Sequence, residues 1–417
     1  MTERVEVLDS IMGSGKSTAI MKWMKQNWSE RYIYISPLLS EIEERLQDEL
    51  PELEFITPTS TQNGSKGVDF LQLLKEGKNI GTTHSLFKLM TREHMKYIEE
   101  WGYIVIVDEE LEMIRPYTDY TRHDYMWLHE HGFISVSDQH QLLWVDGGMP
   151  DETRYHQLRA MCDLGMLYTS KRDWSMVTVH LPTELITCAK RVIVLTYLFE
   201  GSVFDKFLQM KSIPVVPFKE VDGELKPISK DVLRGLIKFV GGVQTEKIDE
   251  TYRKSSFSST WYTTSANDLT IVSKFIRNVC LAEGMKAEQT MWTAKGSCVE
   301  QADNKRKNGR YVKPSGYTKY KKDGEYHLCW VGCSAKATNI YQDKEMLVHC
   351  YNRYPHRVLL AFMQDVGYPI EDGRFALAEM LQWVWRSRIR KGEPIKLAIL
   401  PKRMRMLFKD WLYNREE

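Results

Sequence analysis

The sequence lacks the features of a membrane protein and of a disulfide-stabilised secreted protein. No apolar run reaches the roughly 18 residues that a membrane-spanning helix needs. An apolar segment already begins at Val5, which leaves no room for a signal peptide before it. The seven cysteines are odd in number and scattered, a pattern typical of reduced thiols. We therefore expect a cytoplasmic protein with no membrane partner.

The sequence also lacks a strong net charge. Its 57 lysines and arginines nearly balance 56 aspartates and glutamates, so the net charge is +1 at pH 7. The whole molecule therefore exerts no strong pull on nucleic acid, and any such attraction must come from a local basic segment. With 417 residues, of which 43% are hydrophobic, the chain is long enough for two globular domains or more.

The N-terminal segment combines the parts of a phosphate-binding loop. An apolar strand over Val5–Asp9 runs into a glycine-rich turn and then into an amphipathic helix. In such a loop the backbone amides close round a polyphosphate, the lysine reaches the β and γ phosphates, and the serine hydroxyl ligates Mg²⁺. Ser10 stands where the strict pattern has its first glycine. We expect nucleotide binding by Gly13, Ser14, Gly15, Lys16, Ser17 and Thr18, with Ser17 also on the metal.

A second apolar strand ends abruptly in acids. The run over residues 103–107 is followed by Asp108, Glu109 and Glu110. Carboxylates at the carboxyl end of a buried parallel strand lie at the ligand-binding edge of an open α/β sheet. We expect Asp108 to hold Mg²⁺ through its water shell and Glu109 to polarise the water that attacks the γ phosphate. An Asp-Glu pair alone is weak support, but here it follows a phosphate loop in a chain of alternating strands and helices.

Two further turns follow predicted strands. Ser36-Pro37 and Gly81-Thr82-Thr83-His84 offer hydroxyls or amides that suit the phosphates of a bound strand. A simple turn explains the first equally well. Capping of the next helix by Thr83 or Ser85 explains the second.

Changes in pattern along the chain predict the domain boundaries. A first α/β domain is expected over residues 1–220, with an irregular insertion rich in Tyr, His and Asp at about 114–175. Residues 221–256 are mixed and polar, which predicts a linker or hairpin. A second α/β domain is expected over residues 257–417.

Cations and tyrosines are interleaved between residues 303 and 325. This composition suits a single strand of nucleic acid, whose phosphates pair with Lys and Arg and whose bases stack. A solvated basic loop explains it equally well. The residues concerned are Lys305, Arg306, Lys307, Arg310, Tyr311, Lys313, Tyr317, Lys319, Tyr320, Lys321 and Lys322.

Taken in order, these motifs resemble those of a superfamily 2 helicase, in particular the compact helicases that bacteriophages encode for DNA replication. No late motif is strong alone, and the order and spacing along nearly the whole chain carry the resemblance. The matching segments are Gly13–Thr18, Ser36-Pro37, Gly81–His84, Asp108-Glu109, Leu195-Thr196, Ala335–Asn339 and Gln382–Arg390.

The resemblance implies an α/β fold of two tandem RecA-like lobes with parallel sheets and an ATP site in the cleft between them. It implies ATP and Mg²⁺ as cofactors, DNA as a single strand or forked duplex as partner, other replication proteins as further partners, and the host cytoplasm as location. The work would be translocation on DNA with strand separation. A packaging-type DNA translocase is an alternative that needs a nuclease domain with clustered carboxylates. Another alternative is a DNA-binding module without enzymatic activity, in which the phosphate loop is only part of the fold.

The last motif departs from the family pattern Q-x-x-G-R-x-x-R. Trp385 replaces the glycine, and the second arginine is shifted by one place. On a continuous helix Gln382, Arg386 and Arg390 recur at four-residue steps and share one face. The resemblance therefore implies a catalytic role for these three, with the two arginines reaching the γ phosphate, while Arg388 points away.

Overall fold

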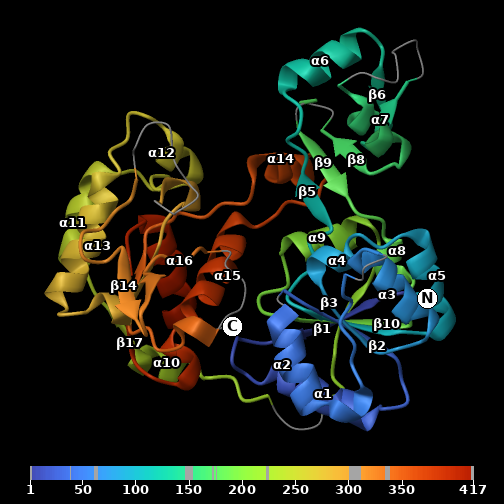
Figure 1. Ribbon diagram of the computed structural model, residues 1–417. Helices are drawn as coiled ribbons and strands as arrows, with labels where there is room; N and C mark the ends of the chain where they lie inside the picture. Colours follow the sequence, from blue (N-terminus) through green and yellow to red (C-terminus); the bar gives the residue numbers. More distant parts are fainter. Residues whose placement is uncertain are drawn as a thin grey trace. The chain divides into compact units, whose positions relative to one another are not determined.

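The computed structural model describes residues 2–37, 39–60, 64–145, 154–170, 173–174, 176–221, 225–299, 311–333 and 339–414. The chain forms two compact units (Figure 1). The first consists of Met1–Ser10, Gly15–Leu225 and Pro355–Glu371, and the second of Ile11–Ser14, Lys226–Tyr354 and Asp372–Glu417. Each unit is built on a parallel sheet, so the expected α/β class is confirmed.

The first unit contains a six-stranded sheet in the order β11-β1-β10-β4-β2-β3, with all neighbours parallel. Helices cover both of its faces (Figure 1), which is why its strands are almost continuously apolar in sequence. The strands are β1 (Val5–Asp9), β2 (Tyr32–Ser36), β3 (Ile80–Thr83), β4 (Ile104–Asp108), β10 (Arg191–Thr196) and β11 (Val215–Pro217).

Alternate residues of these strands face opposite helical layers, as the pleat of a strand requires. In β4, Ile104 and Ile106 pack in one core with α1 (Lys16–Gln26) and α2 (Leu39–Glu49). Val105 and Val107 pack in the other core. The second layer contains α3 (Lys66–Lys75), α4 (His84–Phe87), α5 (Arg92–Trp101), α8 (Glu184–Thr187) and α9 (Val203–Met210).

The expected irregular insertion is a small folded module of the first unit. It has its own core of buried aromatic and aliphatic side chains, among them Tyr125, Leu128 and Leu158. Strands β5, β9 and β8 form one antiparallel sheet, and β6 pairs with β7. The elements are β5 (Ile114–Pro116), α6 (Arg122–Glu130), β6 (Ile134–Val136), β7 (Leu142–Trp144), α7 (His156–Asp163), β8 (Leu167–Thr169) and β9 (Val177–His180).

A helix from the C-terminal half belongs to the first unit, where the sequence-based boundaries did not place it. This helix, α14 (Arg357–Asp365), packs against β5 and β9. The Phe362 ring lies edge-on to His180 at a centroid distance of 5.1 Å, and the Ser170 hydroxyl donates a hydrogen bond to Asp365 at 2.6 Å. The apolar stripe of α14 is thus buried on the first unit, although it lies far along the chain.

The second unit contains a four-stranded parallel sheet in the order β12-β17-β16-β13. Trp292 and Val348 of this sheet pack with α13 in a core that is almost fully buried. Its strands are β12 (Ile237–Phe239), β13 (Thr290–Thr293), β16 (Met346–His349) and β17 (Ile395–Ile399), with a hairpin of β14 (Lys319–Lys322) and β15 (Glu325–Leu328). Its helices are α10 (Lys230–Leu236), α11 (Gly242–Thr251), α12 (Ser259–Thr263), α13 (Thr270–Ala282), α15 (Asp372–Val384) and α16 (Lys402–Tyr413).

The stretch 221–256, expected to be a linker or hairpin, is largely structured and belongs mainly to the second unit. It contains α10, β12 and α11, and β12 pairs with β17 at the sheet edge. Leu233 and Ile237 are buried. Strand β12 has three residues and lies between two short helices, so its sequence pattern is too brief to identify it.

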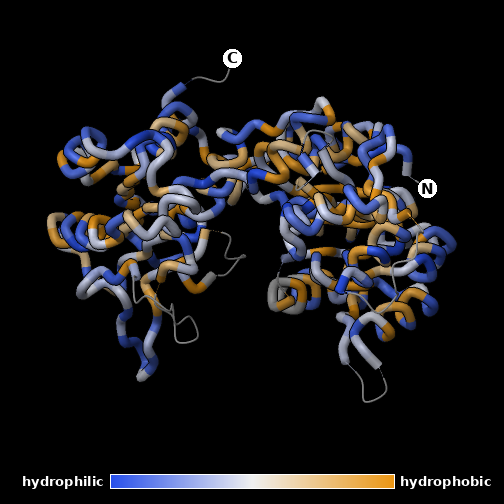
Figure 2. Tube along the Cα trace, turned by 90° about the horizontal axis from the view of Figure 1, so that it is seen from above, coloured by the Kyte–Doolittle hydropathy of each residue, from blue (hydrophilic) through white to orange (hydrophobic). Residues whose placement is uncertain are grey.

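Hydrophobic and hydrophilic segments alternate along the chain (Figure 2), as expected of elements that bury one face. Among the described residues, no helix is both long and apolar enough to cross a membrane.

Candidate nucleotide-binding site

Three adjacent strands of the first unit end level with one another. In the parallel register Asp9 of β1 lies opposite Thr196 of β10, and Leu195 of β10 lies opposite Asp108 of β4. The segments that follow β1 and β4 therefore start from the same edge of the sheet, the edge at which open α/β sheets bind ligands. The sequence predicted this meeting, but not that β10 lies between the two strands.

The phosphate loop ends in a backbone geometry that requires glycine. Gly15 directly precedes α1 and has a φ of 91°, in the left-handed region, and Gly13 has a φ of 77°. Helix α1 begins at Lys16 and has no side-chain cap. Its first amides and the positive end of its dipole are therefore directed at the loop, an arrangement that suits an anion. The Ser14 hydroxyl is buried without a hydrogen-bond partner among the described residues, which also fits a polar ligand.

Lys16 lies among three carboxylates. Its ammonium group donates a hydrogen bond to the Ser10 carbonyl. Burial lowers the pKa of Lys16 to about 8, and the negative charges of Asp108, Asp9 and Glu109 act in the opposite direction. A bound polyphosphate would add negative charge next to this ammonium and favour its charged form.

Asp108 is positioned by one residue of β2 and by the first residue of α4. The Tyr34 hydroxyl donates to its Oδ2 at 3.3 Å, and a ring nitrogen of His84 lies 2.8 Å from its backbone carbonyl.

The two turns that follow β2 and β3 have structural roles. The Thr83 hydroxyl accepts a hydrogen bond from an amide of α4 at 3.3 Å, so its expected capping role is confirmed. Ser36-Pro37 is buried, which favours the simple-turn interpretation of that motif.

Glu109 has a strained backbone. Its φ is 66°, although it is not a glycine, and its amide donates to the Leu195 carbonyl at 3.0 Å. This conformation costs about 1–2 kcal/mol and persists only where the surroundings impose it, as they often do at functional sites. The left-handed backbone at Glu109 therefore helps to position its carboxylate.

Two carboxylates at this edge were not assigned from the sequence. Asp9 accepts the amides of Leu198 and Phe199 at 2.9 and 3.0 Å, so it joins the end of β1 to the turn after β10. Glu110 accepts the Thr196 hydroxyl at 3.2 Å. The sequence shows that Asp9 is the last residue of an apolar strand and that Glu110 is the third of three consecutive acids. It does not show that β1 pairs with β10, and this pairing brings the two carboxylates to the same edge of the sheet.

Glu110 is the carboxyl group most perturbed by this arrangement. Burial raises its pKa to about 7, and the nearby charges of Asp9 and Asp205 add to the increase. Hydrogen bonds from Ser202 and Thr196 act in the opposite direction. Through its hydrogen bond with Thr196, Glu110 links the segment that follows β4 to the end of β10.

In the second unit, the expected helical face of Gln382, Arg386 and Arg390 does not exist. Helix α15 ends at Val384, Ser387 is extended with a φ of −81° and a ψ of −176°, and a short 3₁₀ turn begins at Arg388. The Ser387 hydroxyl donates to the carbonyl of the last helical residue at 2.7 Å. The run Trp383–Trp385 is buried across the end of the helix.

The three arginines of this segment differ in their contacts. Arg386 is 9% exposed and donates to the carbonyls of Gly332 and Cys333 at 3.1 and 3.3 Å. Arg388 forms an ion pair with Glu345 at 2.9 Å. Arg390 is exposed, and Gln382 is half-buried. The expected motif at 335–338 lies outside the described residues, and Asn339 begins a short 3₁₀ turn.

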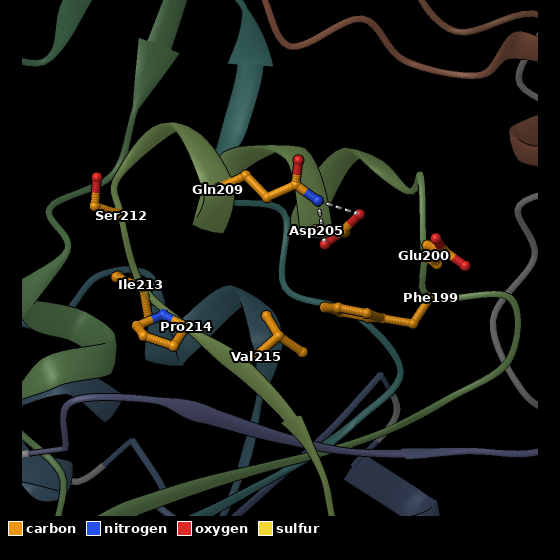
Figure 3. Close-up of a pocket in the computed structure, with 8 residues that line it drawn as sticks. All are labelled: Phe199, Glu200, Asp205, Gln209, Ser212, Ile213, Pro214 and Val215. Carbon is orange, nitrogen blue, oxygen red and sulfur yellow. Dashed lines mark hydrogen bonds between the residues drawn. The ribbon is translucent and has the colours of Figure 1, made fainter.

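A hollow beside α9 provides a contrast to the phosphate loop (Figure 3). Glu200 and Asp205 both line it, and the Gln209 amide donates to both carboxylate oxygens of Asp205 at 3.0 and 2.9 Å. None of the residues that line it is a lysine or arginine that could offset this negative charge and bind phosphate, so this hollow does not suit a nucleotide. Across the described ranges, no group of three or more His, Cys, Asp or Glu side chains could hold a metal. Mg²⁺ at Ser17 and Asp108 would therefore take further ligands from phosphate and water, as this ion commonly does.

Comparisons with known proteins point to a prophage-encoded relative. Residues 232–412 match a family described as the YonV C-terminal Rossmann-like domain. The chain is 27% identical over 440 residues to the SPbeta prophage-derived uncharacterized protein YonV of Bacillus subtilis (strain 168), covering 99% of this chain and 100% of that protein. Apo XPD aligns with a TM-score of 0.45 at 11% identity, over 98% of this chain and 95% of its own. S. tokodaii Xpd4 aligns with a TM-score of 0.45 at 12% identity, over 98% and 94%. These values assign no activity.

The loop makes a direct prediction for Lys16→Ala. We expect loss of ATP turnover, because the ammonium that reaches the phosphates is removed, while the fold is retained. ATP hydrolysis and circular dichroism measure the two properties. Turnover at the wild-type rate would exclude the phosphate-loop interpretation.

Glu109→Gln keeps the shape of the side chain and removes its charge. We expect ATP to bind and hydrolysis to fall by more than about tenfold, which corresponds to roughly 1.4 kcal/mol of barrier. Glu112→Gln is the matched control, because Glu112 follows in the same loop, is exposed and pairs with Lys88. Hydrolysis that falls equally in both variants, or in neither, would remove Glu109 from its assigned role.

Proposed function

We propose that the protein hydrolyses ATP and couples hydrolysis to movement on nucleic acid, as a motor of the superfamily 2 helicase type. The observation that carries this proposal is the placement of Lys16 among Asp108, Glu109 and Asp9 at one edge of the first sheet. Transfer of a phosphoryl group to water needs a cation on the phosphates, a metal-holding carboxylate and a group that orients water. The motif order along the chain supports the helicase class.

Each residue of the site has a defined task in this proposal. Lys16 and the amides at the start of α1 bind the phosphates, and Ser17 and Asp108 hold Mg²⁺, which neutralises phosphate charge when bound. Glu109 orients the attacking water. Tyr34 and His84 hold Asp108 in place from both its carboxylate and its carbonyl.

We propose DNA as the track and strand separation in phage replication or recombination as the work. The prophage origin stated in the name of the YonV relative supports this setting. Contacts with other replication proteins and a location in the host cytoplasm follow from the same setting.

Two alternatives receive less support. A packaging-type translocase needs a nuclease site of clustered carboxylates, and the part of the chain that the structure describes contains no such metal-holding group. A binding module without hydrolysis would have no use for the strained backbone at Glu109.

Arg390 is the stronger candidate for the arginine that acts on the γ phosphate. It is exposed, whereas Arg386 is buried and its guanidinium donates to the Gly332 and Cys333 carbonyls. We propose that Arg386 contributes by holding this backbone segment, which precedes the motif at 335–339, and that Gln382 supports the same site.

The motor proposal predicts that nucleic acid stimulates ATP turnover. We expect single-stranded DNA to raise the turnover number severalfold more than duplex DNA or RNA, because a motor hydrolyses ATP efficiently only on its track. Steady-state hydrolysis with each nucleic acid, and with Lys16→Ala as the blank, measures this. Hydrolysis that is unaffected by every nucleic acid would contradict the motor assignment while leaving an ATPase.

The arginine series separates catalysis from packing. Arg390→Ala should lower the turnover number at least tenfold with little change in DNA affinity without nucleotide, because an arginine that stabilises transferring charge acts only during the reaction. Arg388→Ala is the control, since this arginine is occupied by Glu345 and should mainly lower thermal stability. If Arg388→Ala abolished hydrolysis and Arg390→Ala did not, the assignment would be reversed.

A further inference from the structure

The hairpin of β14 and β15 has two faces of different character. Its tip is a two-residue turn, Asp323-Gly324, with φ values of 51° and 88°, which suits the twist of a tight hairpin. This turn fixes the register, so that Tyr320 lies opposite His327 and Lys321 opposite Tyr326. Residues opposite one another share a face, and faces alternate along each strand.

The inner face packs on the second unit. The rings of Tyr320 and His327 stack at a centroid distance of 5.4 Å, and the Lys344 ammonium lies 4.0 Å from the Tyr320 ring centroid. Tyr320 packs against the core around α13. Lys322 and Glu325 continue this face toward the tip.

The outer face is exposed over its whole length and carries no acid. It consists of Lys319, Lys321, Tyr326 and Leu328. The Tyr326 side chain is 67% exposed and Leu328 39%, and the Lys319 ammonium lies 4.3 Å from the Tyr326 ring centroid. Tyr326 opposite Lys321 and Leu328 opposite Lys319 give this face both positive charge and apolar surface, which matches a ligand that carries negative charge and flat apolar groups.

We propose that this outer face is a stacking platform for a single strand of nucleic acid, with a base on Tyr326 and neighbouring phosphates on Lys319 and Lys321. Two cations beside an exposed ring match the alternation of phosphate and base along such a strand. The inference rests on the proposed function, because it names the surface on which the motor would hold its track. The inference also separates the lysines of the hairpin into two groups, because Lys322 lies on the opposite face from Lys319 and Lys321.

Binding without nucleotide tests the platform separately from catalysis. The probe is a short fluorescein-labelled oligothymidylate, followed by anisotropy over a range of salt concentrations with the full chain. Tyr326→Ala should weaken binding by about tenfold, within the range measured for one lost base stack. Tyr326→Phe should restore it, because the ring remains.

The lysines are tested by the salt dependence of the same binding. Replacing Lys319 and Lys321 together by glutamine should reduce the log–log slope by about 1.4, or about 0.7 for each phosphate contact on a single strand. Lys322→Gln is the matched control on the inner face and should leave the slope nearly unchanged. All these side chains are exposed, and thermal unfolding confirms that each variant is folded.

The possible outcomes distinguish this inference from the function on which it rests. Unchanged affinity in Tyr326→Ala, or a slope that falls as much per replaced lysine in Lys322→Gln as in the double variant of Lys319 and Lys321, would overturn the platform. If hydrolysis were still stimulated by DNA in that case, the motor proposal would stand. Binding that depends on Tyr326 in a protein without DNA-stimulated hydrolysis would keep the platform and remove the motor. Preferential binding of polyglutamate over the oligothymidylate would indicate an acidic protein partner and would also overturn the proposed nucleic-acid platform.

Discussion

The parallel register of β1, β10 and β4 is the constraint on which the candidate site depends. Because the strands end level, the phosphate loop and the acids after β4 meet although many residues separate them in sequence. Asp9 strengthens this alignment, since its carboxylate accepts two amides from the turn after β10. A shift of register by one residue would turn each side chain of a strand to the other face and separate these groups.

The same geometry concentrates negative charge. Lys16 supplies one positive charge close to the carboxylates of Asp108, Asp9 and Glu109. A bare polyphosphate entering such a site would meet more repulsion than attraction. Mg²⁺ reverses this balance, because a bound divalent cation is the largest local charge in a site. The arrangement therefore suits a nucleotide that arrives as its magnesium complex.

The sequence predicted the parts of the site better than their surroundings. Apolar runs ending at Asp9 and Asp108 identified two buried strands, and their polar ends located the ligand-binding edge. Local pattern could not reveal long-range pairing, so the position of β10 and the return of α14 to the first unit were missed. The four-residue spacing of Gln382, Arg386 and Arg390 suggested one helix face, but α15 ends at Val384 and the backbone is extended at Ser387.

The near-zero net charge also limits how the protein can hold a polyanion. With a net charge of +1, long-range attraction is weak, and affinity has to come from a few local contacts. On the proposed platform, two lysines would release few counterions, so stacking on Tyr326 would have to supply much of the binding energy. Weak contacts of this kind suit a motor, because each step along a strand requires that the previous contact be broken. Stacking on an aromatic ring also tolerates any base, which a protein that moves along arbitrary sequence needs.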